Sequence, residues 1–202
     1  MNGYKNIMGT IILIMTLVSS FLPAQGNEST GNSKTRYAIE IDPAAFVFNG
    51  YAFHIRVQPE QSDHILLGAG IYAMDFPDLI IGFNSKNKDK GWNVRLNQGI
   101  GLFGEYHFSE INRNFFAGVQ LAVHTYKIRN EKIAGSGRFN TFLGMGYGGY
   151  TFKPFENNGF YIKTWMGVGY TTKTGGENRL DRLVYDISPV LFFAAVHLGY
   201  MF

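Results

Sequence analysis

Alternation with a period of two is the feature that most limits what this chain can fold into. Residues 161–171 read YIKTWMGVGYT, so Lys163, Gly167 and Gly169 fall on one side. A helix would scatter these three residues around its circumference and would be destabilised by each glycine. A β-strand instead places successive side chains on opposite faces. The pattern therefore predicts a strand, whose other face is Ile162, Thr164, Met166, Val168 and Tyr170.

The same sorting recurs and predicts eight strands. They are expected at residues 37–48, 51–58, 64–74, 93–108, 114–128, 138–152, 159–172 and 185–202. In the fourth strand, the apolar face holds Val94, Leu96, Ile100 and Leu102. In the sixth, Leu143, Met145 and Tyr147 lie opposite Asn140, Gly144, Gly146 and Gly148. A tilted strand needs about 9–11 residues to cross a membrane, so seven of these strands are long enough and the second is marginal.

The expected connections alternate in length. Short ones are Pro59–Asp63, Ser109–Arg113 and Lys153–Asn158, and long ones are 75–92, 129–137 and Lys173–Val184. Short turns at one end and long loops at the other are typical of bacterial outer-membrane barrels. Asn49-Gly50 is expected to form a two-residue hairpin turn, which makes the first outer connection an exception.

The charges indicate which face is inside. They share a face with the glycines, while the other face is continuously aliphatic, and glycine lets backbones crowd a narrow interior. A polar inside with an apolar outside is the arrangement of a membrane barrel. Charged residues make up only 16% of the sequence, below the share usual at soluble surfaces. The alternative is a secreted, soluble β-sandwich or lipocalin-like barrel, which would have the opposite arrangement.

The N-terminus predicts export. Lys5 precedes an uncharged apolar run from Ile11 to Leu22, and the small residues Ala24 and Gly26 suit signal-peptidase cleavage. We expect a signal peptide at 1–26, a flexible leader at 27–36 and the barrel at 37–202. The alternative for residues 1–26 is an uncleaved membrane anchor.

Composition excludes several functions. The chain has no cysteine, which excludes disulfides, thiolate metal sites and a cysteine nucleophile. Its formal net charge of +3 is not gathered in a basic patch, so nucleic acid is not an expected partner.

The C-terminus is the most specific signal. Ala194, Val196, Leu198, Tyr200 and Phe202 alternate back from a terminal aromatic residue. This ending resembles the signal that outer-membrane proteins present to their insertion machinery. With the export signal and the eight-strand rhythm, the whole mature chain resembles small outer-membrane barrels of the OmpA/OmpX type. The resemblance implies the outer membrane of a Gram-negative bacterium, with outer-membrane lipid and the barrel-insertion machinery as partners. An extracellular partner is not indicated.

Ionisable residues are expected on the inward face. They are Glu40, Asp42, His54, Arg56, Arg95, Glu105, His107, His124, Lys163 and His197. They could form a substrate path, a proton relay or a catalytic site. An eight-stranded barrel, however, is only wide enough for its side chains to fill, so we expect them to pair as a polar filling. Accordingly, no catalytic, cofactor-binding or metal-binding residue and no cofactor is predicted.

Three specific chemistries have little support in the sequence. Glu105 and His107 share a face and could supply two metal ligands, but a third would have to come from another strand. A hydrolase of the lipid A deacylase type resembles this barrel in size and has a His-x-Ser arrangement. Here Tyr126 stands at the serine position after His124, and Ser188, beside Asp186, has no histidine nearby in sequence. The glycine-rich stretch 144–149 alternates as a strand and has no following helix to receive a phosphate.

The apolar part of the 75–92 loop, residues 75–83, is expected to cap the barrel mouth, since exposed apolar loops are covered or used. It could instead rest on the membrane or meet a partner. The predicted function is an integral outer-membrane barrel with a structural or interaction role and no enzymatic activity. The alternatives are a narrow or gated pore and a lipid-modifying hydrolase.

Overall fold

The computed structural model describes residues 34–155 and 158–202. The predicted signal segment 1–26 and all of the predicted leader except its last three residues lie outside this range. The barrel strands are β1 (Arg36–Ile41), β2 (Tyr51–Gln58), β3 (Ile65–Asp75), β4 (Trp92–His107), β5 (Asn114–Asn130), β6 (Ile133–Phe152), β7 (Phe160–Gly176) and β10 (Val190–Met201). Two short helices, α2 (Pro43–Val47) and α3 (Asp78–Gly82), and a hairpin of β8 (Arg179–Leu180) and β9 (Leu183–Val184) lie in the connections.

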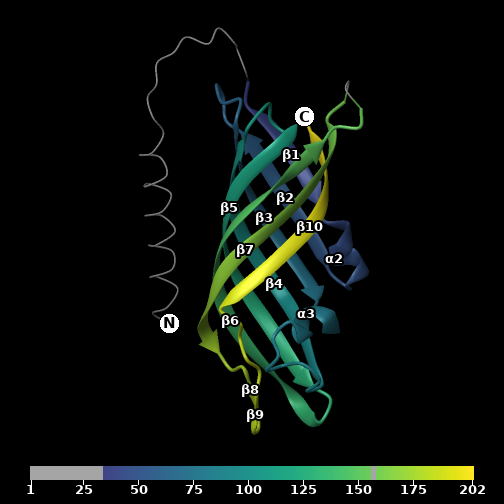
Figure 1. Cartoon of the computed structure of the whole chain (residues 1–202), viewed down its shortest axis with the longest axis vertical. Coiled ribbons are helices and arrows are strands. Elements are labelled where there is room, and N and C mark those ends of the chain that lie inside the picture. The colour runs from purple at the N-terminus through teal and green to yellow at the C-terminus, as the bar shows by residue number, and fades with distance from the viewer. Residues whose placement is uncertain (1–33, 156–157) are drawn as a thin grey trace. The chain divides into compact units, whose positions relative to one another are not determined.

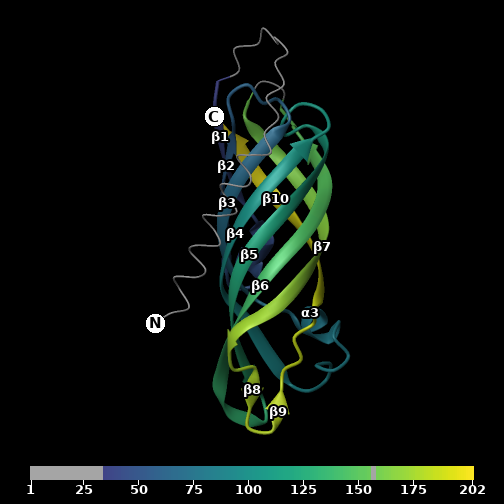
Figure 2. The ribbon, with the colours of Figure 1, turned by 90° about the vertical axis from the view of Figure 1, so that its left-hand side faces the viewer.

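The eight long strands form a closed antiparallel barrel in the order β1-β10-β7-β6-β5-β4-β3-β2. Each strand pairs with its neighbours along the chain, and β1 pairs with β10 to close the ring. Figure 1 shows the short turns at one end and α3 with the β8–β9 hairpin at the other, and Figure 2 shows the strands winding around the barrel. The predicted fold, an all-β up-and-down barrel of eight strands, is confirmed. Within the described ranges, neither helix is long and apolar enough to cross a membrane.

The first predicted strand is wrong after Ile41. Asp42 accepts a hydrogen bond from the Ala44 backbone N–H at 2.9 Å, and Pro43 occupies the first helical turn. An aspartate cap followed by proline is a strong helix start, and it outweighs the apolar alternation that continues through residue 48. Because β1 ends at Ile41 and β2 begins only at Tyr51, the predicted two-residue turn at Asn49-Gly50 is absent. The first outer connection is therefore long, and the exception to the alternation is instead the two-residue connection between β5 and β6, residues 131–132.

Three other boundaries differ. The predicted loop at 129–137 is largely strand, because β5 reaches Asn130 and β6 begins at Ile133. The seventh strand continues to Gly176 rather than ending at 172. Residues 185–189 are irregular, and β10 begins only at Val190.

Two face assignments are also wrong. A register shift between Leu96 and Gln98 reverses the facing of β4, so Val94 and Leu96 are buried inside while Arg95 turns outward. A β-bulge has this effect because it inserts one unpaired residue into the alternation.

On β6, Leu143, Met145 and Tyr147 point inward and Gly144 and Gly146 outward. These large side chains fill space beside the inward glycines of β7. A side chain at Gly169 would overlap Leu143, and one at Gly167 would overlap Tyr147.

Most of the outer surface is apolar as predicted. Large aliphatic and aromatic side chains are exposed on the outward faces of the strands. They include Phe53, Ile55, Leu67, Ile71, Ile100, Leu102, Val119, Val123, Met166, Val168, Phe192 and Val196.

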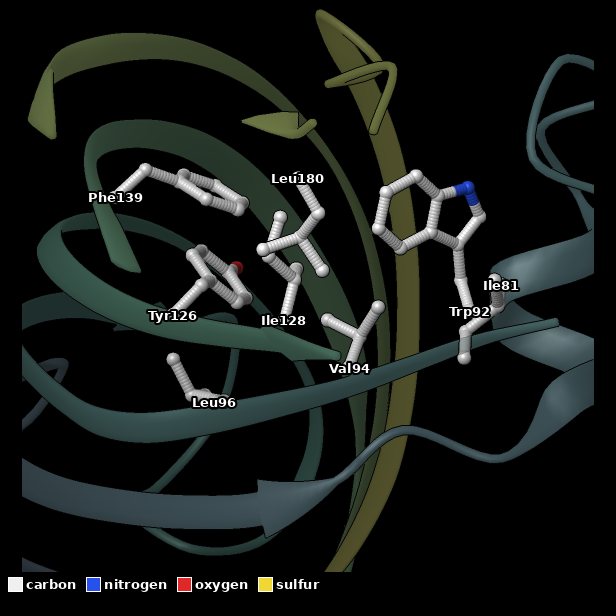
Figure 3. Close-up of a cluster of buried hydrophobic side chains, with 8 residues drawn as sticks. All are labelled: Ile81, Trp92, Val94, Leu96, Tyr126, Ile128, Phe139 and Leu180. Carbon is white, nitrogen blue, oxygen red and sulfur yellow. The ribbon is translucent and has the colours of Figure 1, made fainter. Parts of the chain in front are cut away.

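A hydrophobic cluster closes the long-loop end (Figure 3). It joins Ile81 of α3 and Leu180 of β8 to side chains from β4, β5 and β6. The predicted capping by residues 75–83 is thus confirmed for Ile81, while Leu79 and Phe83 remain exposed. The loop is tied down by Asn87, which donates to the Asp186 carbonyl at 2.8 Å and accepts from its N–H at 2.9 Å.

Candidate functional site

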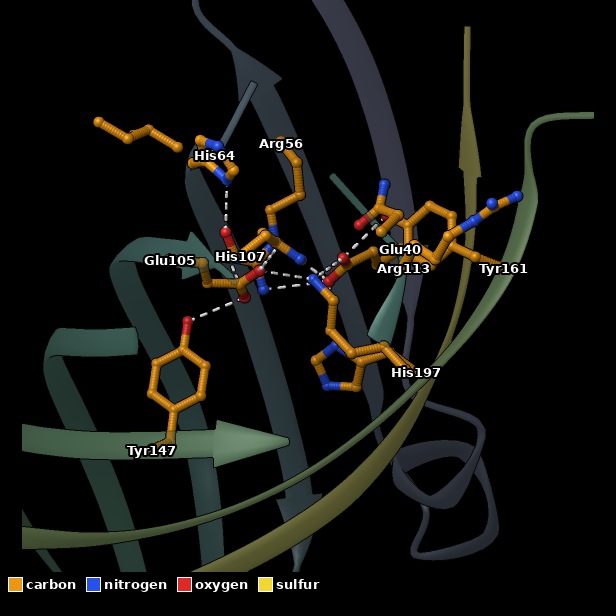
Figure 4. A network of polar contacts seen from close by, with 12 residues as sticks. Glu40, Arg56, His64, Glu105, His107, Arg113, Tyr147, Tyr161 and His197 are labelled. Atoms are coloured by element: carbon orange, nitrogen blue, oxygen red, sulfur yellow. Dashed lines mark hydrogen bonds and ion pairs between the residues drawn. The ribbon is translucent and has the colours of Figure 1, made fainter. Parts of the chain in front are cut away.

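Four charged side chains meet in the half of the lumen near the short turns (Figure 4). Lys163 of β7 donates to Glu40 of β1 at 2.6 Å and to Glu105 of β4 at 2.8 Å. Arg56 of β2 lies 3.0 Å from Glu40 and 3.4 Å from Glu105. All four are buried. We refer to Glu40, Arg56, Glu105 and Lys163 as the charge cluster; its two acids and two bases balance.

Neutral donors complete the coordination of both carboxylates. Tyr161 donates to Glu40 at 2.9 Å and Tyr147 donates to Glu105 at 3.0 Å. His107 lies 3.3 Å from Glu105. These contacts come from strands on several sides of the barrel, so the cluster spans the lumen rather than lining one wall.

His197 of β10 links the charge cluster to the aromatic filling. Trp165 Nε1 donates to His197 Nε2 at 3.2 Å, and His197 Nδ1 lies 3.1 Å from Glu40. Because Nε2 accepts, a neutral His197 carries its proton on Nδ1 and donates it to the carboxylate.

Inward glycines make room for these large side chains. A side chain at Gly68 of β3 would overlap Arg56, and one at Gly199 of β10 would overlap Tyr161. The Arg56 guanidinium also lies over the Phe103 ring, 4.5 Å from its centroid. Leaving one of these buried charges unpaired would cost several kcal/mol, so the cluster is held by mutual pairing.

A second polar layer lies next to the charge cluster. Gln120 donates to the Tyr72 hydroxyl at 2.9 Å, and this hydroxyl lies 2.8 Å from His124 Nε2. His124 Nδ1 lies 3.1 Å from the Tyr126 hydroxyl. The layer is uncharged when His124 is neutral.

The structure places eight of the ten predicted inward ionisable residues in the lumen: Glu40, His54, Arg56, Glu105, His107, His124, Lys163 and His197. The other two predictions are wrong. Asp42 caps α2 instead. Arg95 turns outward at the bulge and donates to Asp75 at 2.7 Å.

Sequence reasoning missed Tyr147 and Tyr161, which donate to the charge cluster, and Trp165, which donates to His197. Tyr161 and Trp165 share the inward face with Lys163, which was a usable signal. For Tyr147, the alternation of β6 predicts the outward face, which is wrong.

One group of side chains has metal-ligand geometry. Ligand atoms of Glu40, His54 and His197 lie within 4.8 Å of one another. Both oxygens of Glu40 already bind cationic side chains, and both ring nitrogens of His197 have partners. A metal ion would have to compete with Arg56 and Lys163, so the geometry favours the hydrogen-bonded cluster. The predicted Glu105–His107 pair is likewise engaged within it.

The arrangement offers little to acyl-transfer chemistry. The two His124 ring nitrogens contact tyrosine hydroxyls, and Tyr126 stands where a serine would be needed. Ser188 donates to the Val190 carbonyl at 2.8 Å. Among the described residues, no hydrogen bond joins a serine hydroxyl to a histidine ring.

Neither a protein-family profile nor the sequence of a curated protein matches the chain. One solved structure with a similar fold is the N-terminal β-barrel domain of Pseudomonas aeruginosa OprF. It is 13% identical, with a TM-score of 0.41, and the match covers 83% of this chain and 96% of that one. At this level of similarity we infer function from the chain's own residues.

Proposed function

We propose that this chain is an integral outer-membrane β-barrel protein of the OmpA/OmpX type, with a closed lumen and a structural or interaction role. The observation that supports this proposal most is that the barrel is polar inside and apolar outside, the reverse of a soluble barrel. Paired charges are buried inside the barrel, while exposed aliphatic residues such as Val119, Val168 and Phe192 cover its outside. In water this outside would be a large unfavourable apolar surface, whereas in lipid it is the favoured one.

The connections supply an orientation. By analogy with bacterial barrels, the short turns face the periplasm, and α3 and the β8–β9 hairpin face the exterior. Export would use the predicted signal at 1–26. Assembly would use the C-terminal strand, which ends at the exposed Phe202, as the element read by the insertion machinery. An exterior partner would meet the exposed loops.

The charge cluster supports a closed lumen rather than a pore. It joins opposite walls through direct contacts of 2.6–3.4 Å. The test is conductance in a planar lipid bilayer, with a general porin as the positive control. We expect no discrete conductance steps from the refolded protein, and regular steps would favour the pore.

We propose no enzymatic activity, which is supported by the tyrosine partners of His124. Incubation of the refolded protein with phospholipid or lipid A tests this point. Release of fatty acid above a heat-denatured control would contradict the proposal.

A further inference from the structure

The barrel wall has an incomplete seam on one side of β10. β1 pairs with β10 only from Ala38↔Met201 to Ile41↔Leu198. Residues 190–197 continue along β7, but no strand in the described part of the chain pairs with their other edge. At about 3.3 Å per residue, this free edge is roughly 26 Å long. That is a large part of the height of a membrane barrel.

Helix α2 stands where the missing strand would continue. Asp42 and Pro43 turn the chain out of the sheet at this point, and proline has no N–H to offer β10. The helix contacts β2, β3 and β10, but a helix cannot complete the hydrogen-bonding ladder of a strand. No backbone ladder therefore spans the seam between α2 and β10, and the α2 side chains beside it include the small Ala44 and Ala45.

The exposure of β10 changes where β1 ends. Its inward residues beside β1, Gly199 and Met201, are buried, and so is His197, the first inward residue past the last β1 pair. Its inward residues beyond β1, Leu191, Phe193 and Ala195, are only half-buried. The interior is thus accessible along the unpaired part of the strand and sealed along the paired part.

A pocket of about 850 Å³ lies at this seam, and it is open to the outer face, because the exposed residues Met166, Val168 and Phe192 also border it. It is bordered by Ala44 and Phe48 on the α2 side and by Phe193 and Ala195 on the β10 side, and it reaches His54 and His124 in the lumen. Its volume lies within the range of about 300–1,000 Å³ that is usual for small-molecule sites.

The chemistry of the cavity indicates its occupant. The lining is largely aromatic and aliphatic, including Phe103, Leu143, Met145 and Trp165. The only acidic residue in it, Asp42, is at the α2 margin, where it caps the helix. Such a lining suits an uncharged hydrocarbon chain. The unpaired β10 edge adds backbone N–H groups beside the seam, and these need acceptors in an apolar environment.

We propose that the seam between α2 and β10 is a lateral opening through which the acyl chain of a membrane lipid enters the lumen cavity. The proposal rests on the membrane location proposed above. An acyl ester supplies both a chain for the cavity and carbonyl oxygens that accept hydrogen bonds from the β10 edge. A second copy of the chain pairing with this edge would leave the cavity empty, and α2 already lies beside β10.

Tryptophan fluorescence can test this directly. Trp165 lines the cavity, whereas Trp92, the other tryptophan of the sequence, lies in the cluster at the long-loop end. Trp92→Phe therefore leaves one reporter. The variant is reconstituted into phosphatidylcholine vesicles with either ordinary or mid-chain dibrominated acyl chains. Bromine quenches only at short range, and we expect Trp165 emission to fall at least twofold in the brominated vesicles.

Two further substitutions in the Trp92→Phe background distinguish quenching by lipid in the cavity from quenching by lipid outside the barrel. Ala195→Phe narrows the opening and should restore most of the emission, each variant being compared with itself in unbrominated vesicles. Ala117→Phe makes the same change on the outward face of β5 and should leave the quenching unchanged. Equal quenching in all three proteins would assign it to lipid outside the barrel and overturn the proposal.

Photolabelling makes the test independent of any variant. The wild-type protein is irradiated in vesicles containing phosphatidylcholine with a diazirine on its acyl chain, and labelled peptides are mapped by mass spectrometry. We expect labels on the half-buried inward residues Trp165 and Phe193 as well as on outward residues such as Val119. Labels on outward residues only would overturn the proposal.

The outcomes distinguish this proposal from the proposed function. A protein that floats with vesicles but shows neither Trp165 quenching nor inward labels inserts without admitting lipid, which overturns the lateral opening alone. Failure to float with vesicles would contradict the membrane location itself. A dimer with unquenched Trp165 would assign the β10 edge to a second copy and also overturn the proposal.

Discussion

Removing Lys163 should destabilise the barrel more than almost any other single charge removal. Its side chain is fully buried and holds Glu40 at 2.6 Å and Glu105 at 2.8 Å. In Lys163→Met, two buried carboxylates share Arg56 as their only remaining cationic side chain in the charge cluster. Breaking a buried ion pair by removing one partner costs about 3–5 kcal/mol, because a buried charge is left uncompensated. We expect a loss of this size in the free energy of unfolding.

A double variant isolates the charge imbalance from lost packing. Lys163→Met combined with Glu105→Gln restores a cluster with one acid and one base. Replacing both partners of a buried pair is far less costly than removing one. We expect the double variant to recover at least about 2 kcal/mol relative to Lys163→Met.

The assay is urea unfolding in lipid vesicles, followed by tryptophan fluorescence. Lys86→Met is the matched surface control, because Lys86 pairs with Asp186 at 3.2 Å while its side chain is 72% exposed. Exposed pairs contribute about 0–1 kcal/mol, so this control should be close to wild type. If Lys163→Met were as stable as Lys86→Met, water would have to solvate the carboxylates, and the closed lumen would be wrong.

Three other perturbations test the outward face, the C-terminus and the exterior loop. Val168→Arg should lower the free energy of unfolding in vesicles by about 2–4 kcal/mol, with Leu79→Arg on the exposed α3 as a near-neutral control; equal effects would contradict the facing of β7. Phe202→Asp should reduce membrane-inserted protein in cells yet refold normally in detergent, because Phe202 is 65% exposed and contributes little packing; a matching refolding defect would instead assign its role to stability. A hydrogen bond from Asn84 holds the pKa of the Asp186 carboxyl below its usual value, so the contacts of this carboxylate with Asn84 and Lys86 are at full strength above about pH 4 and weaken as the pH falls through the lowered pKa. A spin label on Leu79→Cys should therefore become more mobile only in strong acid, and Asp186→Asn should remove that pH dependence.

The sequence predicted the barrel because its main signal is long and regular. Period-two alternation on β5, β7 and β10 matches the observed facing, and it placed Glu40, Glu105 and Lys163 inside together. Where one face of a strand is so consistently apolar, a shift of its pairing register by one residue would turn every inward charge to the outer face. The facing of these strands is therefore strongly determined.

The wrong predictions on β1, β4 and β6 arise from features that an alternating pattern does not reveal. Asp42 and Pro43 start a helix within an apolar run, and the bulge near Asn97 reverses the facing of Arg95. On β6, the facing depends on space left by Gly167 and Gly169 of the neighbouring strand. Such contacts between strands are non-local, so the lateral seam beside α2 could not be predicted from the sequence.

Cell fractionation tests the central claim, a barrel that spans the outer membrane, most directly. The protein is expressed with its own N-terminus in a Gram-negative host, membranes are separated on a sucrose gradient, and samples are run on gels with and without boiling. We predict that the protein sediments with the outer membrane and that the unboiled form migrates differently, because in a closed barrel the strands pair with one another throughout most of the wall. Mature protein recovered from the periplasm without detergent, with the same migration before and after boiling, would contradict the account.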